Sequence, residues 1–324
     1  PLLNNIFKSG CRIPFINLNH STRMAHTPLE DSLKFASIDI GSNAMRLLFS
    51  RVVQNSSVTF VKESLIRMPL RLGEDAFTDG YISDYNIKRL KNTVHAFHLM
   101  IKAYEPISFK ACATAALRTA SNGRDIVNQI NDQYDVGLEI ISGKEEARII
   151  MSNHIERHLN PNKHYVYIDV GGGSTEISFI MNNEKTSSKS FPIGSVRILK
   201  NQVISNDWNE MQQWITQKKS QIDGPIQSIC TGGNINKIFS MSDTKKNNEI
   251  DVNTSKKVLD QLKPLDVNHR IIELGLRPDR ADVITHAGKI YLSAMEWSEC
   301  SSMIVPHSGL PDGIIHELYE DYIS

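Results

Sequence analysis

Short apolar runs with strand character alternate along this chain with longer runs in which apolar residues recur at helical spacing. YVYIDV at 165–170 and FASIDI at 35–40 are rich in β-branched and aromatic residues, and such runs predict buried strands. Between them, apolar residues repeat with a helical period from Ile87 to Ile101, after Ser83, a favoured N-cap residue. Alternating strands and helices predict an α/β fold.

The same alternation continues to the end of the chain. A polar, lysine-rich stretch at 241–256 predicts an exposed loop. Further strands are expected at 107–113, 138–141, 176–181, 226–230 and 303–305, and further helices near 207–220, 280–297 and 313–322.

Three consecutive glycines, Gly171 to Gly173, follow Asp169 at the end of the strand at 165–170. Their backbone can bend tightly and bring N–H groups close to an anion, and Ser174 adds a hydroxyl donor. Asp169 and Glu176 flank this turn and could hold a divalent cation directly or through water. The combination predicts a cradle for phosphate or metal-phosphate, and a plain glycine-rich hairpin is the alternative.

The same design occurs earlier in the chain, because the strand at 35–40 also ends in an acid, Asp39, and a turn. Residues 38–41 lie over residues 168–171 at one constant offset, and Gly41, Ser42 and Asn43 form the second turn. A third strand follows each copy, after turn residues at 55–57 and at 182–184. The pattern predicts an internal duplication, with two turns that hold a phosphate chain from both sides of a cleft.

The composition describes an ordinary globular protein of a size that suits two domains. Among its 324 residues, 36 are Lys or Arg and 36 are Asp or Glu. No global basic field exists, so a nucleic-acid partner is not expected, and a site for any polyanion must be locally basic. Candidates for that local charge are Arg46, Arg67, Arg71, Arg118, Lys144 and Arg148.

The four cysteines are widely spaced and predict neither a zinc site nor a disulfide framework. Cys112 and Cys230 lie in apolar strands and are expected to be buried free thiols, which suits a cytoplasmic protein. No apolar run reaches the length of a membrane span, so no membrane association is expected.

Arg118 follows a predicted strand end, where open α/β sheets place their ligand sites. Its guanidinium could fork onto phosphate oxygens, and a surface salt bridge is the alternative. Ser142 and Glu145 have the spacing of a capping box, which assigns Glu145 to the helix backbone. Glu146 then points elsewhere from the first helical turn, although an acid at a helix start is also favoured by the helix dipole.

Gly232 and Gly233 lie between the strand at 226–230 and an apolar helical run. The N–H groups that open this helix could face an anion or a nucleotide. Taken alone, the segment is equally typical of a plain strand-to-helix turn.

At these residues the chain resembles the exopolyphosphatase / guanosine pentaphosphate phosphohydrolase (Ppx/GppA) family. That family lies within the superfamily of actin, sugar kinases and heat-shock chaperones. The matching segments, in the family's order, are DIGSNAMRL at 39–47, ATAALR at 113–118, ISGKEEARII at 141–150, DVGGGSTE at 169–176, SFPIG at 190–194, TGGNI at 231–235 and, more weakly, GLPDG at 309–313.

The resemblance implies two duplicated ribonuclease-H-like (actin-like ATPase) domains with a cleft between them. Residues 34–143 and 311–324 would form the first domain and 144–310 the second, with 1–33 as an extension outside the core. It implies Mg²⁺ or another divalent cation, and the catalytic glutamate of the family aligns with Glu146. The implied metal-binding residues are Asp169, Glu176 and Asp39, and the implied phosphate-binding residues are Gly41, Ser42, Asn43, Arg118, Gly171, Gly172, Gly173, Ser174, Gly232 and Gly233.

The implied activity is release of the terminal phosphate of inorganic polyphosphate, and hydrolysis of guanosine pentaphosphate is the nearest alternative. Larger family members carry a C-terminal helical domain that does not follow here, which favours polyphosphate. A kinase of the same superfamily and a non-catalytic sensor of guanosine phosphates are further alternatives. Pro311 and Asp312 stand where the family usually has an Arg-Glu pair, which removes one expected cation. A homodimer is one option for the oligomeric state.

Overall fold

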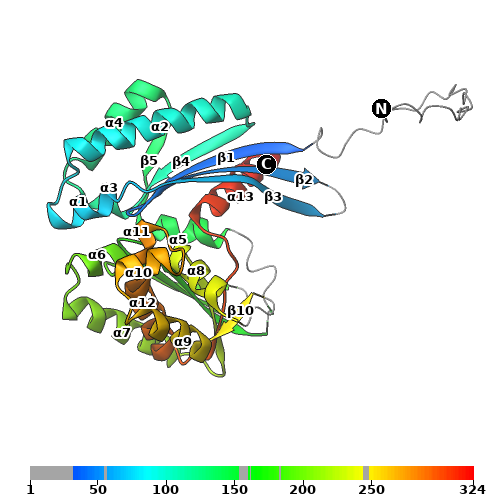
Figure 1. Ribbon diagram of the computed structural model, residues 1–324. Coiled ribbons are helices and arrows are strands. Elements are labelled where there is room, and N and C mark those ends of the chain that lie inside the picture. Colours follow the sequence, from blue (N-terminus) through cyan, green and yellow to red (C-terminus); the bar gives the residue numbers. More distant parts are fainter. Residues whose placement is uncertain (1–31, 55–56, 153–159, 161, 182–183, 244–247) are drawn as a thin grey trace, which may run out of the picture.

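Two β-sheets, each covered by helices, form the two halves of the molecule (Figure 1). The computed structural model describes residues 32–54, 57–152, 160, 162–181, 184–243 and 248–324. The predicted extension at 1–33 and the predicted turn residues 55, 56, 182 and 183 therefore lie largely or wholly outside the described residues. The first sheet has five strands and the second has six.

The first sheet has the strand order β3-β2-β1-β4-β5. β1, β2 and β3 form an antiparallel meander, and β4 and β5 run parallel to β1. Its strands are β1 (Leu33–Ile40), β2 (Met45–Gln54), β3 (Val58–Met68), β4 (Ser108–Ala113) and β5 (Leu138–Ile140). The helices of this half are α1 (Leu72–Thr78), α2 (Asp84–Tyr104), α3 (Ala115–Thr119) and α4 (Gly123–Tyr134).

The second sheet repeats this arrangement, because its order read from one edge is β8-β7-β6-β9-β11-β10. β6, β7 and β8 form the antiparallel meander, and β9 and β11 run parallel to β6. Its strands are β6 (His164–Val170), β7 (Thr175–Met181), β8 (Glu184–Phe191), β9 (Ile226–Thr231), β10 (Glu249–Asp251) and β11 (Ser302–Ile304). The remaining helices are α5 (Gly143–Met151), α6 (Ser195–Leu199), α7 (Ser205–Lys219), α8 (Gly233–Met241), α9 (Val252–Leu262), α10 (Val267–Ile272), α11 (Pro278–Ala281), α12 (Ile284–Trp297) and α13 (Leu310–Ile323).

The repeated strand order confirms the predicted fold class, a two-domain α/β architecture built from a duplicated unit. Local sequence signals placed the predicted helix after Ser83 correctly. Ser83 is the N-cap of α2, and its hydroxyl accepts a hydrogen bond from the N–H of Asn86. The buried side chains of α2 lie on one face, which packs on the first sheet.

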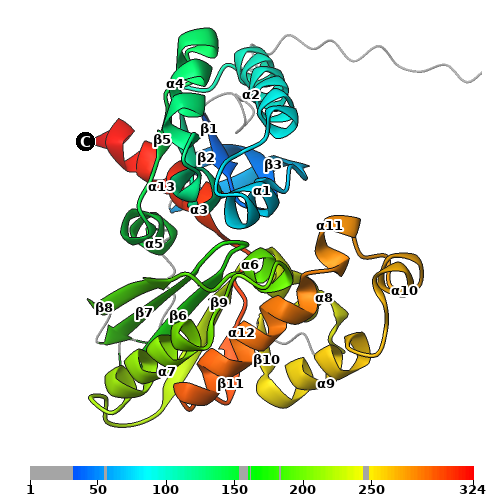
Figure 2. The same cartoon turned by 90° about the vertical axis from the view of Figure 1, so that its left-hand side faces the viewer.

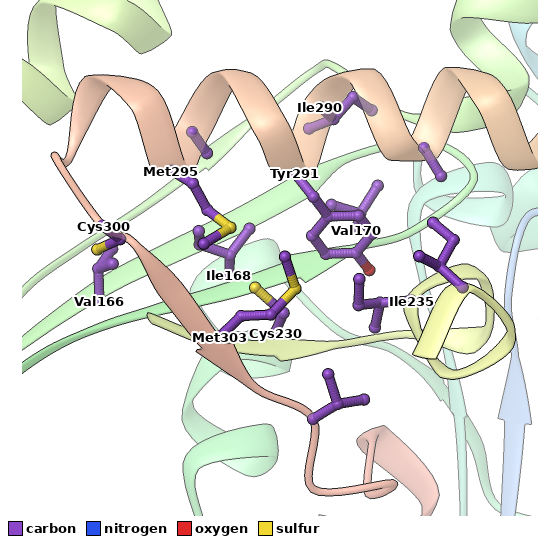
Figure 3. Close-up of a cluster of buried hydrophobic side chains, with 14 of the residues drawn as sticks. Val166, Ile168, Val170, Cys230, Ile235, Ile290, Tyr291, Met295, Cys300 and Met303 are labelled. Atoms are coloured by element: carbon purple, nitrogen blue, oxygen red, sulfur yellow. The ribbon is translucent and has the colours of Figure 1, made fainter. Parts of the chain in front are cut away.

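The core of the second half lies between its sheet and helices α7, α8, α9 and α12. Figure 3 shows α12 crossing this sheet, with Met295 over Ile168 and Tyr291 over Val170. Each such side chain contributes about 1.5–3 kcal/mol when it is fully removed from water. Tyr291 also donates a hydrogen bond from its hydroxyl to the carbonyl of Thr231. The core thereby fixes the C-terminal end of β9, where Thr231 lies.

The last helix, α13, returns from the second half to the first (Figure 2). Its residues Ile315 and Tyr319 pack on Phe35, Leu48 and Val52 of the first sheet. On its other side, α13 packs on α5, which lies on the second sheet. The division of the chain into two domains at residues 144 and 311 stays a prediction. α5 and α13 contact each other across the predicted boundary between these domains.

Two sequence-based predictions about secondary structure are wrong. The stretch at 241–256 is not a loop throughout, because residues 249–256 belong to β10 and the start of α9. Ile250 is buried and Asp251 caps α9 by accepting a hydrogen bond from the N–H of Thr254. Lys256 and Lys257 lie on the exposed side of this helix, and Lys245 and Lys246 lie outside the described residues.

The helix predicted at 280–297 is also interrupted. α11 ends at Ala281 and α12 begins at Ile284. Pro278 occupies the first turn of α11, where a proline is tolerated, so a short separate helix forms before α12. Further helices that the sequence did not predict are α1, α3, α4, α6 and α10.

Cys112 and Cys230 are buried free thiols, as predicted, and so is Cys300. Cys11 lies outside the described residues. Within the described part of the chain, no helix has both the length and the hydrophobicity that a bilayer span requires.

We predict that Gly313→Ala destabilises the contact between α13 and α5. A Cβ at Gly313 would lie 1.9 Å from the carbonyl oxygen of Ile149, and backbone atoms cannot move aside as a side chain can. The free energy of unfolding should fall by about 1–3 kcal/mol, the usual cost of overpacking. Urea denaturation measures this loss.

Gly309→Ala is the matched control, because its Cβ would approach no atom closer than 3.9 Å. Its free energy of unfolding should stay near that of the wild type. Equal stability of the Gly313→Ala variant and the wild type would contradict the close approach of the two helices.

Candidate active site

The two predicted turns have the same hydrogen-bonded geometry. In the first turn the N–H of Gly41 donates to the carbonyl of Ala44 at 3.1 Å, and in the second the N–H of Gly171 donates to the carbonyl of Ser174 at 2.9 Å. These two N–H groups close the turns, so they are not free to bind phosphate. Phosphate binding by residues 41 and 171 stays a prediction that these two N–H groups do not support.

The N–H groups that follow are free. Those of residues 42, 43, 172 and 173 have no hydrogen-bond partner among the described residues. The two turns also touch, because a Cβ at Gly172 would lie 3.0 Å from the Cβ of Ser42. Backbone donors from both halves of the molecule therefore converge on one place, as an anion site requires.

The side chains of the turns are largely occupied. Asn43 donates from Nδ2 to the carbonyl of Asp279 at 2.7 Å, which ties the first turn to α11. Ser174 donates from Oγ to Oε1 of Glu176 at 2.7 Å. The side chains of Asn43 and Ser174 thus hold the site together, and phosphate binding by the two residues stays a prediction for their backbone N–H groups.

Equivalent positions of the duplicated unit carry different charges. Asp39 faces Arg46 across β1 and β2, and Arg46 Nη1 donates to Asp39 Oδ2 at 2.5 Å. Asp169 faces Glu176 across β6 and β7, at the same offset along the chain. The first pair neutralises itself, whereas the second places two acids directly opposite each other, which is destabilising without a cation or a proton.

The environment of Glu176 reflects this opposition of two acids. Oε1 accepts hydrogen bonds from Ser174 and Ser190, but Oε2 is buried and has no partner in the described structure. Burial, followed by the charge of Asp169, raises the pKa of Glu176 to about 7. Burial also raises the pKa of Asp169, and the hydroxyl of Thr231, which donates to Asp169 Oδ1 at 2.5 Å, opposes that shift.

Glu146 is a buried acid in the first turn of α5. Ser142 caps this helix by accepting a hydrogen bond from the N–H of Glu145 at 3.1 Å. The carboxylate of Glu145 does not complete the predicted capping box, because it accepts from the Arg148 guanidinium at 2.7 and 2.9 Å. The distinction between the two neighbours still holds, since Glu145 pairs on the surface and Glu146 faces the site.

Burial and then the charge of Glu176 raise the pKa of Glu146 well above its usual range. Arg118 opposes this shift, because its Nη1 lies 3.4 Å from Oε2 of Glu146. The same Nη1 donates to the carbonyl of Ile141 at 2.7 Å. Arg118 is thus a partner of Glu146, and the arrangement does not support the prediction that it binds phosphate directly.

A pocket of about 420 Å³ opens where the two turns meet. Of the predicted site residues, Arg118 and Glu176 do not line it. The predicted residues that line it are Asp39, Gly41, Ser42, Asn43, Glu146, Asp169, Gly171, Gly172, Gly173, Ser174, Gly232 and Gly233.

The pocket also contains cations that the sequence did not predict. Three distant segments supply them, β3, α8 and α11 with its N-cap, and no spacing pattern connects these segments: Lys62, Lys237, Arg277 and Arg280. Burial, and then the charge of Arg67, lower the pKa of Arg280 to about 10. A cation that neighbouring cations destabilise favours an anionic ligand.

The basic residues named from the sequence are mostly ion-paired. Within that set, Arg46 and Arg67 line the pocket. The pairs are Arg46 with Asp39, Arg67 with Asp279, Arg71 with Glu74 and Asp282, Arg118 with Glu146, and Arg148 with Glu145 and Glu317.

Pro311 and Asp312 stand where the family usually has an Arg-Glu pair, and the structure shows what surrounds them. Asp312 accepts a hydrogen bond from the N–H of Gly309 and so caps α13. Its carboxylate also pairs with Lys62 Nζ at 2.7 Å. A cation therefore lies beside this loop, although it comes from β3.

The donor set suits a divalent cation in part. Among the described residues, no three His, Cys, Asp or Glu side chains converge to form a metal site by themselves. Asp39 is bound by Arg46, so the expectation that it joins Asp169 and Glu176 as a ligand is not met. Asp169 and the unpartnered Oε2 of Glu176 remain, and Mg²⁺ is commonly held by one or two carboxylates together with water and substrate phosphates.

Comparisons with known proteins identify the family of the chain. The model of the Ppx/GppA phosphatase family matches residues 52–321. A curated relative, the bifunctional 3-dehydroquinate synthase/phosphatase of Fusobacterium nucleatum subsp. nucleatum, is 28% identical over 276 residues, which cover 77% of this chain and 41% of that protein. The chain thus spans about two fifths of the length of this relative.

Two solved structures share the fold. A Ppx/GppA family member from Aquifex aeolicus has a TM-score of 0.70 at 21% identity, and 90% of this chain covers 99% of that one. An exopolyphosphatase from Cytophaga hutchinsonii has a TM-score of 0.76 at 20% identity, with 89% and 98% covered. The family match extends over most of the sequence and confirms the resemblance found in its motifs. This chain belongs to the Ppx/GppA phosphatase family.

Proposed function

We propose that the protein is a phosphohydrolase that releases the terminal phosphate of inorganic polyphosphate. The observation that carries this proposal is the meeting of two turns whose N–H groups at 42, 43, 172 and 173 are unused. They open onto the same pocket as Glu146 and Asp169. Phosphoryl transfer needs positioned donors, neutralised charge and an oriented nucleophile, and this pocket offers groups for each.

The other lining residues support a long anionic substrate. Beyond the turns, the pocket wall carries Lys62, Lys237, Arg277 and Arg280, which suit successive phosphate groups of a chain. The fold shared with the Cytophaga hutchinsonii exopolyphosphatase supports the same choice.

Asp169 and Glu176 would hold a divalent cation. When bound, such an ion neutralises charge on phosphate oxygens and on the leaving oxygen. Burial, and then the charge of Asp169, raise the pKa of Glu176 to about 7, and a cation in this place would favour the charged form of the acid.

The chain's own groups account for the remaining steps. The free N–H groups of the two turns bind the terminal phosphate and orient it for in-line attack. Glu146 takes a proton from water while the water oxygen bonds to the terminal phosphorus. The bond from this phosphorus to the bridging oxygen breaks, so orthophosphate and a chain shortened by one phosphate are formed. Arg118 holds the carboxylate of Glu146 in place.

Phosphate release from long-chain polyphosphate tests the proposal, with guanosine pentaphosphate assayed in parallel under the same Mg²⁺ concentration. We expect a higher kcat/KM for polyphosphate. A higher kcat/KM for guanosine pentaphosphate would reassign the substrate. Release of phosphate from neither would favour a non-catalytic sensor of guanosine phosphates.

We predict that Glu146→Gln lowers kcat by about a hundredfold or more, because glutamine cannot accept a proton. Substrate binding should persist, since the turns are unchanged. The wild-type rate should itself fall as the pH drops through the raised pKa of Glu146, because the base must be unprotonated. Steady-state kinetics over a pH series measures both effects.

Glu145→Gln is the matched control, with the same chemical change one residue away. Its carboxylate pairs with Arg148 on the surface, and such pairs contribute about 0–1 kcal/mol. It should keep near-normal kcat and thermal midpoint. Normal turnover of Glu146→Gln, or loss of activity confined to Glu145→Gln, would refute the assignment of the base.

We predict that Asp169→Asn lowers activity by about a hundredfold or more and abolishes stabilisation by Mg²⁺. Without metal, the variant should melt at or above the wild-type midpoint, because it removes the repulsion between Asp169 and Glu176. Differential scanning calorimetry with Mg²⁺ and with EDTA separates the two effects.

Asp207→Asn serves as the control. Asp207 accepts a hydrogen bond from the N–H of Ile204 at the start of α7, and asparagine can replace it there. This variant should respond to Mg²⁺ as the wild type does. Full activity of EDTA-treated wild-type protein would remove the metal from the mechanism.

A further inference from the structure

The short helix α6 packs its first turn directly on the second glycine turn. The N–H of Ser195 donates to the carbonyl of Gly171 at 3.1 Å, and the N–H of Val196 donates to the carbonyl of Gly172 at 2.9 Å. The carbonyls of the turn therefore face α6, while the N–H groups of residues 172 and 173 have no such partner. α6 thus fixes the orientation of the phosphate-facing backbone.

Arg197, the next residue of α6, extends this contact to the other half of the molecule. Its Nε donates to the carbonyl of Gly173 at 2.7 Å. Its Nη2 donates to the hydroxyl of Thr119, at the end of α3, at 3.2 Å. The guanidinium also lies over the ring of Phe77 in α1, 4.0 Å from its centroid. One side chain therefore contacts the glycine turn and two helices of the first half.

The fit at this point leaves little freedom. A Cβ at Gly173 would lie 2.4 Å from Cζ of Phe77 and 2.7 Å from Cβ of Ala115. The second turn is thus in contact with α1 and α3, and Arg197 is stacked against the same ring. Figure 2 shows α6 beside α1 and α3, where the two halves meet.

Arg197 is an unusual group for a purely structural contact. Among the described residues, no carboxylate forms an ion pair with it. Burial lowers its pKa, the charge of Asp207 opposes that shift, and the nearby charge of Arg118 adds to it. Removing a guanidinium from water is costly unless it finds partners, and here a carbonyl and a hydroxyl accept from two of its donors and an aromatic face lies against its plane.

Thr119 connects this contact to the catalytic groups, because it follows Arg118 in α3. Arg118 in turn holds the carboxylate of Glu146. The sequence of contacts therefore runs from the carbonyl of Gly173 through Arg197 to α3, and from α3 to Glu146. A shift of the turn relative to α3 would change the distance between the bound phosphate and the base.

We propose that Arg197 is a positioning residue that sets the spacing between the second glycine turn and the Arg118–Glu146 pair. The proposal rests on the proposed function for its kinetic part. Its structural part, the fixed spacing of the two halves, is independent of any activity.

Arg197→Met tests the proposal, because methionine keeps an apolar stem over Phe77 but removes every donor and the charge. Misplacement of reacting groups by about 1 Å can cost about a hundredfold in rate. We therefore expect kcat for polyphosphate to fall about ten- to hundredfold at a temperature well below the thermal midpoint, with KM changed less than about threefold.

Lys200→Met is the matched control. Lys200 is the C-cap of the same helix and also faces α1, where it lies 3.6 Å from Glu74, but it does not contact the glycine turn. This variant should keep kcat within about twofold of the wild type. A lowered thermal midpoint with unchanged kcat in Arg197→Met would show a role in stability alone and would overturn the proposal.

A double-mutant comparison tests the route of the effect. In an Arg118→Gln background, Arg197→Met should lower kcat by less than about threefold, because residues that act through one another are not additive. Lys200→Met should have its usual small effect in that background. A full, multiplicative loss would place Arg197 outside this route and reject the proposal.

A distance measurement decides the structural part even if the wild type releases no phosphate. Spin labels at the exposed residues Arg124 in α4 and Gln213 in α7 report the spacing of the two halves, in a Cys11→Ser background because the other cysteines are buried. The distance distribution should broaden or lengthen in Arg197→Met and not in Lys200→Met. Identical distributions would overturn the proposal, whereas failure of phosphate release alone would count only against the proposed function.

Discussion

The opposition of two acids across neighbouring strands is the constraint on which this site depends. Asp169 and Glu176 face each other on β6 and β7, and one oxygen of Glu176 is buried without a partner. Like charges in that position raise the free energy of the folded state unless a cation or a proton intervenes. In the first sheet the equivalent position carries Arg46, which neutralises Asp39. The duplicated unit therefore has one copy whose charges are paired and one copy whose two acids repel each other unless a cation or a proton intervenes.

The first copy is neutral and the second carries excess negative charge, so the two turns present different charges to the pocket between them. Because Arg46 neutralises Asp39, the turn of the first copy can lie beside an anion without repelling it. Burial, and then the charge of Glu176 in the acidic copy, raise the pKa of Glu146, and a raised pKa favours a carboxylate that can take up a proton. Two hydrogen bonds between the halves fix the position of one copy relative to the other. Asn43 donates to Asp279 on one side of the site, and Arg197 donates to Thr119 on the other.

Much of this arrangement could be predicted from local sequence. An apolar run, an acid and a glycine turn are contiguous, so both turns and the duplication were evident from residues 35–49 and 165–179. Glu146 was separated from Glu145 by the spacing to Ser142. The role of Arg118 could not be predicted from local sequence, because a guanidinium after a strand can bind phosphate or a carboxylate. Only the fold places Glu146 beside it.

The remaining features arise from contacts between distant segments. Lys62, Lys237 and Arg280 reach one pocket from three different elements, and no periodicity connects their positions. Residues 249–256 have the polar composition of a loop, yet they form β10 and the start of α9, and Ile250 and Leu259 of these two elements are buried in the core of the second half. In each case tertiary packing outweighs the local signal.

The return of α13 to the first sheet has a consequence for how the molecule acquires its structure. Ser37 in β1 donates a hydrogen bond to the carbonyl of Pro311, across a sequence separation of 274 residues. Until α13 arrives, Phe35, Leu48 and Val52 lack the partners that cover their face of the sheet. Contacts between such distant segments slow folding, because a long loop must close before they form. During synthesis the first sheet can therefore form early from neighbouring strands, but one of its apolar faces stays exposed to solvent. That face is covered only after the second half has been made, so the two halves complete their folding together.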